Sequence, residues 1–91
     1  MQITTNRGKT FDVTFIGALN RFAYRVLIEM KDDIPLADLA ADFDGLTTII
    51  KTDADRPGVK EVYEGFTRLT GMQHNKQAGT IRLTLEKDDA V

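Results

Sequence analysis

One short segment constrains the fold more than any other, because it alone has helical periodicity in a chain that otherwise shows strand patterns. Its apolar residues recur at the spacing of a single helix face: Leu36, Leu39, Ala40 and Phe43. Pro35 suits the first helical position, and Gly45 suits the residue just after the helix. A helix this short is marginal alone. We therefore expect residues 34–45 to lie on a sheet, with the Phe43 side in the core.

The rest of the chain predicts six or seven short strands, at residues 3–5, 10–15, 22–31, 46–52, 59–64, 66–74 and 80–86. The polar turn at 6–9 predicts a hairpin, and residues 17–21 are interpreted as a connection. Residues 59–74 are either two strands or one long strand bent at Gly65; we favour the bend, because a glycine inside a strand pattern often marks a bulge, and Gly71 predicts a second irregularity.

Short connections favour antiparallel pairing. The predicted fold is therefore α+β and mainly antiparallel β, a roll or small barrel of about six or seven strands with one short helix. Alternation on the strands and the helical stripe select ten core residues: Phe11, Val13, Phe15, Val26, Ile28, Leu39, Phe43, Ile50, Leu83 and Leu85.

The length of 91 residues predicts a single β-rich domain over residues 1–87, followed by a loose tail at 88–91. With 42% hydrophobic and 29% charged residues, the composition is that of a folded protein. The absence of cysteine excludes disulfides and thiolate metal sites. No apolar run is long enough for a membrane span, and the first residues lack the apolar region of a signal peptide. We expect no membrane association.

Charge is unevenly distributed along the chain. The net formal charge is +3 over residues 1–31, −6 over 32–64 and +1 over 65–91. An acidic middle argues against nucleic acid as the main partner. In one interpretation these charges neutralise each other within the molecule. In another, the basic third faces the acidic middle of a neighbouring copy, which would give head-to-tail packing.

No motif carries a clear chemistry. His74 is the only histidine and has no cysteine or second histidine to complete a metal site, so we expect an exposed residue at a strand end. Asp53 and Asp55 are too few for a calcium loop, and we expect no metal and no cofactor. The sequence contains no serine, so serine and cysteine nucleophiles are both excluded. An enzyme is the least supported class.

A basic face is the alternative functional hypothesis. Four cations could contact nucleic acid with Phe22 and Tyr24 between them: Arg7, Lys9, Arg21 and Arg25. Phe22 and Tyr24, however, share the strand parity of Val26 and are better interpreted as core aromatics. A small nucleic-acid-binding or ligand-binding β-barrel stays open as the second interpretation.

Three segments, at residues 3–13, 36–45 and 62–67, carry a resemblance to a group of known proteins. The chain resembles the small proteins encoded in the prophage structural-gene regions of Gram-positive bacteria. The resemblance implies a structural role in virion assembly, near the tail or connector, and it supplies no site residues. Implied partners are other virion proteins or further copies of the chain, in the bacterial cytoplasm during assembly or in the virion.

The many short strands also predict self-association or docking through a sheet edge, because an unpaired edge readily accepts another strand. The opposing interpretation is a monomer whose edges are blunted by Lys51, Lys60 and Lys87.

Overall fold

The computed structural model describes residues 1–18, 24–53, 55, 56 and 58–87, and within these it contains eight strands and one helix. In chain order they are β1 (Gln2–Thr5), β2 (Thr10–Asp12), β3 (Phe15–Ala18), β4 (Arg25–Lys31), α1 (Leu36–Phe43), β5 (Thr48–Thr52), β6 (Lys60–Glu64), β7 (Phe66–Asn75) and β8 (Thr80–Lys87). The predicted tail at 88–91 and the predicted contact residue Arg21 lie outside the described residues.

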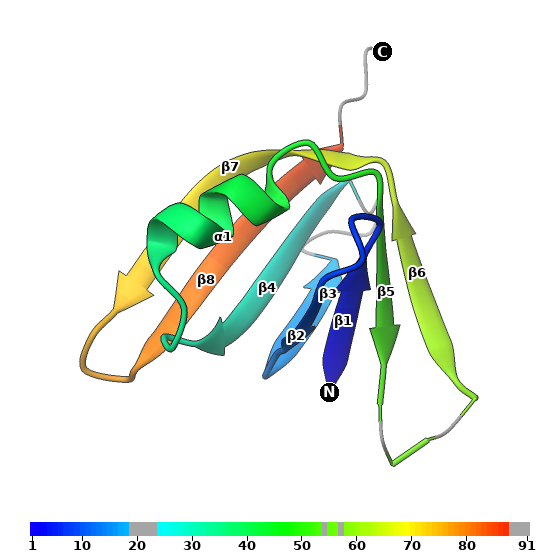
Figure 1. The fold of residues 1–91 in the computed structure, drawn as a ribbon, viewed down its shortest axis with the longest axis horizontal. Coiled ribbons are helices and arrows are strands. Elements are labelled where there is room, and N and C mark those ends of the chain that lie inside the picture. Colours follow the sequence, from blue (N-terminus) through cyan, green and yellow to red (C-terminus); the bar gives the residue numbers. More distant parts are fainter. Residues whose placement is uncertain (19–23, 54, 57, 88–91) are drawn as a thin grey trace.

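The strands form two four-stranded sheets, and every neighbouring pair is antiparallel (Figure 1). Sheet A has the order β2-β1-β5-β6, and sheet B has the order β3-β4-β8-β7. The predicted α+β class, mainly antiparallel with one short helix, is confirmed. In the described part of the chain both sheets are open, so the architecture is a two-sheet roll without barrel closure.

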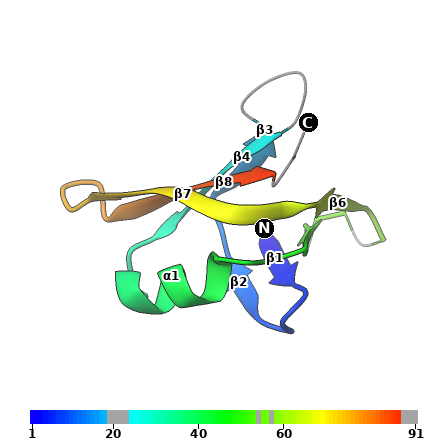
Figure 2. The same ribbon diagram turned by 90° about the horizontal axis from the view of Figure 1, so that it is seen from above.

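Helix α1 and sheet A lie on the same side of sheet B, as Figure 2 shows. The buried apolar side chains between these layers form one cluster. Eight of the ten predicted core residues belong to it: Phe11, Val13, Val26, Ile28, Leu39, Phe43, Leu83 and Leu85. The two exceptions are Phe15 and Ile50.

The predicted strand at 10–15 is wrong as a single element, because the chain changes sheets within it. β2 ends at Asp12 in sheet A, and β3 begins at Phe15 in sheet B. This change breaks the alternation, so Ile16 is buried while Phe15 is 46% exposed on the outer face of sheet B. The Phe15 ring covers Gly17, whose added Cβ would lie 2.9 Å from Cζ of the ring. Because β3 extends to Ala18, residues 17 and 18 belong to a strand, and the predicted connection is wrong at these two positions.

In β5 the predicted inward residue is displaced by one position. Ile49 is fully buried and pairs with Tyr63, whereas Ile50 is only partly buried and pairs with the exposed Val62. Since successive side chains of a strand face opposite sides, only one of two adjacent isoleucines can enter the core.

The favoured single strand bent at Gly65 is wrong, because residues 59–74 form two strands, and the chain passes from one sheet to the other at this glycine. Gly65 has φ +85° and separates β6 in sheet A from β7 in sheet B. Such a backbone conformation favours glycine. The pairing of β7 with β8 then shifts register between Phe66 and Arg68 and again between Leu69 and Gly71, where an irregularity was predicted.

Helix α1 is held on the core by its predicted apolar face. Leu39 and Phe43 are fully buried, and the Phe43 ring centroid lies 4.9 Å from that of Phe11. Leu36 remains exposed, and Pro35 occupies the N-cap position, one residue before the position predicted. Gly45 has φ +77° immediately after the C-cap residue Asp44, as predicted.

Candidate interaction surface

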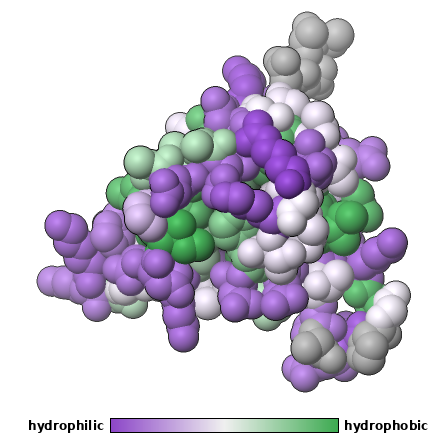
Figure 3. All heavy atoms as spheres, viewed as in Figure 1, coloured by the Kyte–Doolittle hydropathy of each residue, from purple (hydrophilic) through white to green (hydrophobic). Residues whose placement is uncertain are grey.

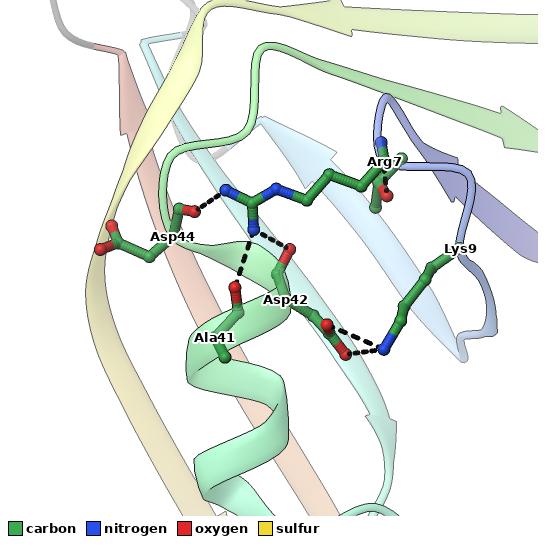
Figure 4. A network of polar contacts seen from close by, with 6 residues as sticks. Arg7, Lys9, Ala41, Asp42 and Asp44 are labelled. Carbon is green, nitrogen blue, oxygen red and sulfur yellow. Dashed lines mark hydrogen bonds and ion pairs between the residues drawn. The ribbon is translucent and has the colours of Figure 1, made fainter.

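Arg7 and Lys9, two of the predicted contact residues, lie in the β1–β2 turn and bind the C-terminal end of α1 (Figure 4). The Arg7 guanidinium donates from Nη1 to the carbonyl oxygens of Ala41 at 2.7 Å and Asp42 at 3.1 Å, and from Nη2 to that of Asp44 at 2.6 Å. Lys9 Nζ lies 2.9 Å from the Asp42 carboxylate. Both cations therefore complete the helix end, where carbonyl groups lack partners within the helix.

Arg25 lies apart from this pair, at the start of β4 in sheet B. Its Nη2 is 2.6 Å from Oε1 of Glu86, and Nε donates to the same oxygen at 2.8 Å. Arg21 lies outside the described residues. The structure thus brings Arg7 and Lys9 together, separates Arg25 from them, and engages all three with acceptors of the same chain.

His74 lies near the end of β7, beside the β7–β8 turn, and its side chain is 27% exposed. Its Nε2 is 3.0 Å from Oδ2 of Asp32, a partner that no pattern in the sequence predicted. A shallow hollow next to this pair is lined by Glu29, Gln73 and Arg82. Arg82 Nε donates to Glu29 Oε2 at 2.9 Å, so the two charged side chains that line the hollow there form an ion pair with each other.

Asp53 and Asp55 form a local turn, in which the Asp55 amide donates to the Asp53 carboxylate at 3.1 Å. Among the described residues, no three His, Cys, Asp or Glu side chains gather in a way that could hold a metal ion.

One edge of β6 has no neighbouring strand among the described residues. The Gly65 N–H donates to the Thr47 carbonyl at 2.8 Å, so the main-chain groups of residue 65 point toward β5. Main-chain groups alternate in direction along an antiparallel strand, so Glu61 and Tyr63 also bond toward β5. The N–H and C=O groups of Lys60, Val62 and Glu64 point away from β5. No strand of the described chain lies on that side, because β6 is last in the order of sheet A.

The corresponding edge of β7 is partly covered. The Gly45 amide donates to the Thr67 carbonyl at 2.8 Å, and the Asp44 carboxylate lies 3.4 Å from the Leu69 amide. The segment that follows α1 thus occupies the edge of β7 near the sheet junction. Figures 1 and 2 place β6 at the outer margin of the molecule, away from α1.

Apolar side chains accompany the free edge. Val62 is 49% exposed on the outer face of sheet A, and Val59, just before β6, is 56% exposed. Hydrophobic spheres appear at the margin over β6 in Figure 3. We define the β6 edge as residues 59–64. Its combination of unpaired main-chain groups with exposed valines is typical of a surface that pairs with another strand.

The opposite face of β6 carries a hydrogen-bonded pair. Tyr63 Oη donates to Glu61 Oε2 at 2.8 Å. Burial raises the pKa of the Tyr63 phenol to about 12, and the hydrogen bond to Glu61 and its negative charge act in the same direction. Lys51 reaches Glu61 at 3.9 Å from the neighbouring strand.

Sequence reasoning identified the strand at 59–64 but not its place at the end of a sheet. The composition of the strand nevertheless indicated an edge. Lys60 and Glu64 lie on the same face as Val62, and Glu61 lies on the opposite face. A strand with charged residues on both faces suits an edge better than a buried centre.

Comparison of the chain with protein families, curated proteins and solved structures finds no match in any of the three. The one helix in the described part of the chain is too short to cross a membrane.

Proposed function

We propose that this chain is a non-catalytic structural module that joins a larger assembly by pairing the β6 edge with a strand of another molecule. The resemblance to prophage structural-region proteins favours a virion or prophage-derived particle, in the tail or connector region. The expected setting is the bacterial cytoplasm during assembly and then the virion.

The observation that carries the proposal is the difference between the β6 edge and the edge of β7. The segment after α1 binds Thr67 at the edge of β7, whereas Lys60, Val62 and Glu64 direct their main-chain groups outward. Unpaired main-chain groups along a strand are a template for strand addition. The exposed side chain of Val62 adds an apolar contact at the centre of the same surface.

The alternative function, nucleic-acid binding, has less support from the side chains that would perform it. Three guanidinium hydrogen bonds direct Arg7 onto the end of α1, and Arg25 is paired with Glu86. A phosphate group would have to compete with these intramolecular acceptors. Affinity for single-stranded oligonucleotides that falls steeply with salt would favour this alternative.

The proposal is tested with Val62→Pro and a matched Val62→Thr variant. Proline removes an N–H that points away from β5, so the bonds within sheet A are retained, and edge strands tolerate it there. Threonine keeps the N–H. Each variant and the wild type are co-expressed with the proteins encoded beside its gene, and complexes are measured after circular dichroism confirms folding.

We expect wild type and Val62→Thr to associate, with a neighbouring gene product or with further copies of the chain, and Val62→Pro not to. Absence of any association that distinguishes proline from threonine would refute a role for the β6 edge. Salt-sensitive binding of a monomer to oligonucleotides would instead favour the nucleic-acid alternative.

A further inference from the structure

The outward-facing residues of β6 form a pattern that complements itself, and this pattern identifies the occupant of the edge. Lys60 and Glu64 lie at equal distances in sequence on either side of Val62, and all three side chains share the outer face of sheet A. When two such strands run antiparallel, each lysine meets a glutamate and the two valines meet at the centre.

We propose that the β6 edge binds the β6 edge of a second copy of this chain, antiparallel, about a twofold axis at Val62. The inference rests on the proposed function, because it specifies the molecule that the free edge accepts. In this register Val62 faces Val62 of the second copy, and Lys60 faces Glu64 of the second copy on both sides of the axis.

The main-chain geometry permits this register. Lys60, Val62 and Glu64 are the residues of β6 whose N–H and C=O groups point outward. A twofold axis at Val62 places these outward groups opposite each other, so each of the three residue pairs exchanges two hydrogen bonds. A shift by one residue would oppose outward groups with inward ones and would lose the ladder.

The side-chain charges select the same register. Within its own sheet Lys60 faces Thr52 and Glu64 faces Thr48, and among the described residues neither cation nor carboxylate has an ion-pair partner. Both are therefore able to form pairs across the new interface. A shift by two residues would put Lys60 opposite Val62 and would remove both ion pairs.

On the other face of β6, the same register puts Glu61 opposite Tyr63 of the second copy. The Tyr63 hydroxyl already donates to the Glu61 carboxylate of its own strand at 2.8 Å. In the pair of chains each hydroxyl has a carboxylate on both sides. No like charges face each other directly on either face of the two strands.

The consequence is a closed dimer in which the two A sheets become one continuous eight-stranded sheet. A twofold interface uses the same patch on both copies and leaves no second site for growth. This differs from head-to-tail packing, which was one of the two interpretations of the charge distribution along the sequence. In the structure, part of that charge is neutralised within the molecule, since Lys9 forms an ion pair with Asp42.

The test is a charge exchange measured by sedimentation at low salt, over concentrations up to high micromolar. In a dimer of Lys60→Glu, the new glutamate faces Glu64 of the second copy at both ion-pair positions. In a dimer of Glu64→Lys, the new lysine faces Lys60 of the second copy. We expect each variant alone to dimerise at least about tenfold more weakly than wild type. An equimolar mixture of the two variants should form a heterodimer, because every facing pair is then opposite in charge. The double variant K60E/E64K should dimerise like wild type.

Lys76→Glu is the matched control, since it makes the same charge change in the exposed β7–β8 turn and should leave dimerisation unchanged. Recovery of the dimer in the mixture and in the double variant supports the register. A monomeric wild type, or a dimer insensitive to both exchanges, overturns the inference. Either result leaves the proposed function standing if a partner sensitive to Val62→Pro is found, so the two failures are distinguishable.

Discussion

Arg7 joins two parts of the chain that are remote in sequence, and replacing it with alanine tests how α1 is stabilised. The helix has no basic residue in its own last turn, and an eight-residue helix is marginal by itself. Arg7 supplies both the missing positive charge and the donors for two of the final helical carbonyls, those of Ala41 and Asp42. Its Nη2 also binds Asp44 and would lie 3.2 Å from a Cβ added at Gly45.

The magnitude follows from these contacts. Each hydrogen bond at this exposed site contributes on the order of 0.5–1 kcal/mol net, below the range for buried charged groups. A positive charge at a helix C-terminus adds roughly 0.3–1 kcal/mol. With three such hydrogen bonds, we expect Arg7→Ala to lower the free energy of unfolding by about 2–4 kcal/mol, a large part of the stability of a small domain.

The assay is urea denaturation followed by circular dichroism, with two variants for comparison. Arg7→Lys keeps the charge but loses the forked donors, so its cost should be intermediate. Lys9→Ala removes one exposed ion pair and should cost at most about 1 kcal/mol. Hydrogen exchange should show the greatest loss of protection in α1 for Arg7→Ala. If Arg7→Ala lowers the free energy of unfolding no more than Lys9→Ala does, the hydrogen bonds of Arg7 to the end of α1 do not stabilise the fold as argued.

Three further predictions concern the core, the acidic loop and the partly buried phenol of Tyr63. Phe43→Ala should cost about 3–5 kcal/mol because it empties a fully buried position against Phe11, and an unchanged melting temperature would contradict the docking of α1. EDTA should leave the melting temperature unchanged, since Asp53 and Asp55 form only a local turn; a drop of several degrees would indicate a bound metal. The pKa of Tyr63 is about 12 in the folded state and about 10 in the unfolded state. The stability that this difference contributes is therefore complete below about pH 10 and is lost between about pH 10 and 12. Wild type should therefore lose more stability than Tyr63→Phe over that interval, and parallel losses would contradict the raised pKa.

The local elements were predictable because short-range chemistry determines them. The spacing of Leu39 and Phe43 predicted the helical face, and both side chains are fully buried. Gly45 predicted the helix end and Gly65 an interruption of the strand pattern, since both adopt backbone conformations that favour glycine. The turn at 6–9 predicted the hairpin of β1 and β2, and the structure has that pairing.

The candidate site was less predictable, because it depends on which strands are neighbours. The sequence identified the strand that contains Val62 but not its position at the end of sheet A. Arg7 and Lys9 appeared in sequence as free cations for a ligand, whereas in the structure they bind α1. Contacts between residues more than thirty positions apart leave no local pattern from which to infer them.

The sequence by itself determined the secondary structure class, the helix and most of the core, because periodicity and turn chemistry act over a few residues. The tertiary structure decided where strands change sheets and which edges remain open. Because the chain changes sheets between β2 and β3, Phe15 is exposed and Ile16 is buried, whereas the alternation of residues 11–15 predicts a buried Phe15. The segment after α1 occupied part of the β7 edge, while the edge of β6 was left open. The physical reason is that strand order depends on how the whole core is buried, whereas strand formation depends on neighbouring residues.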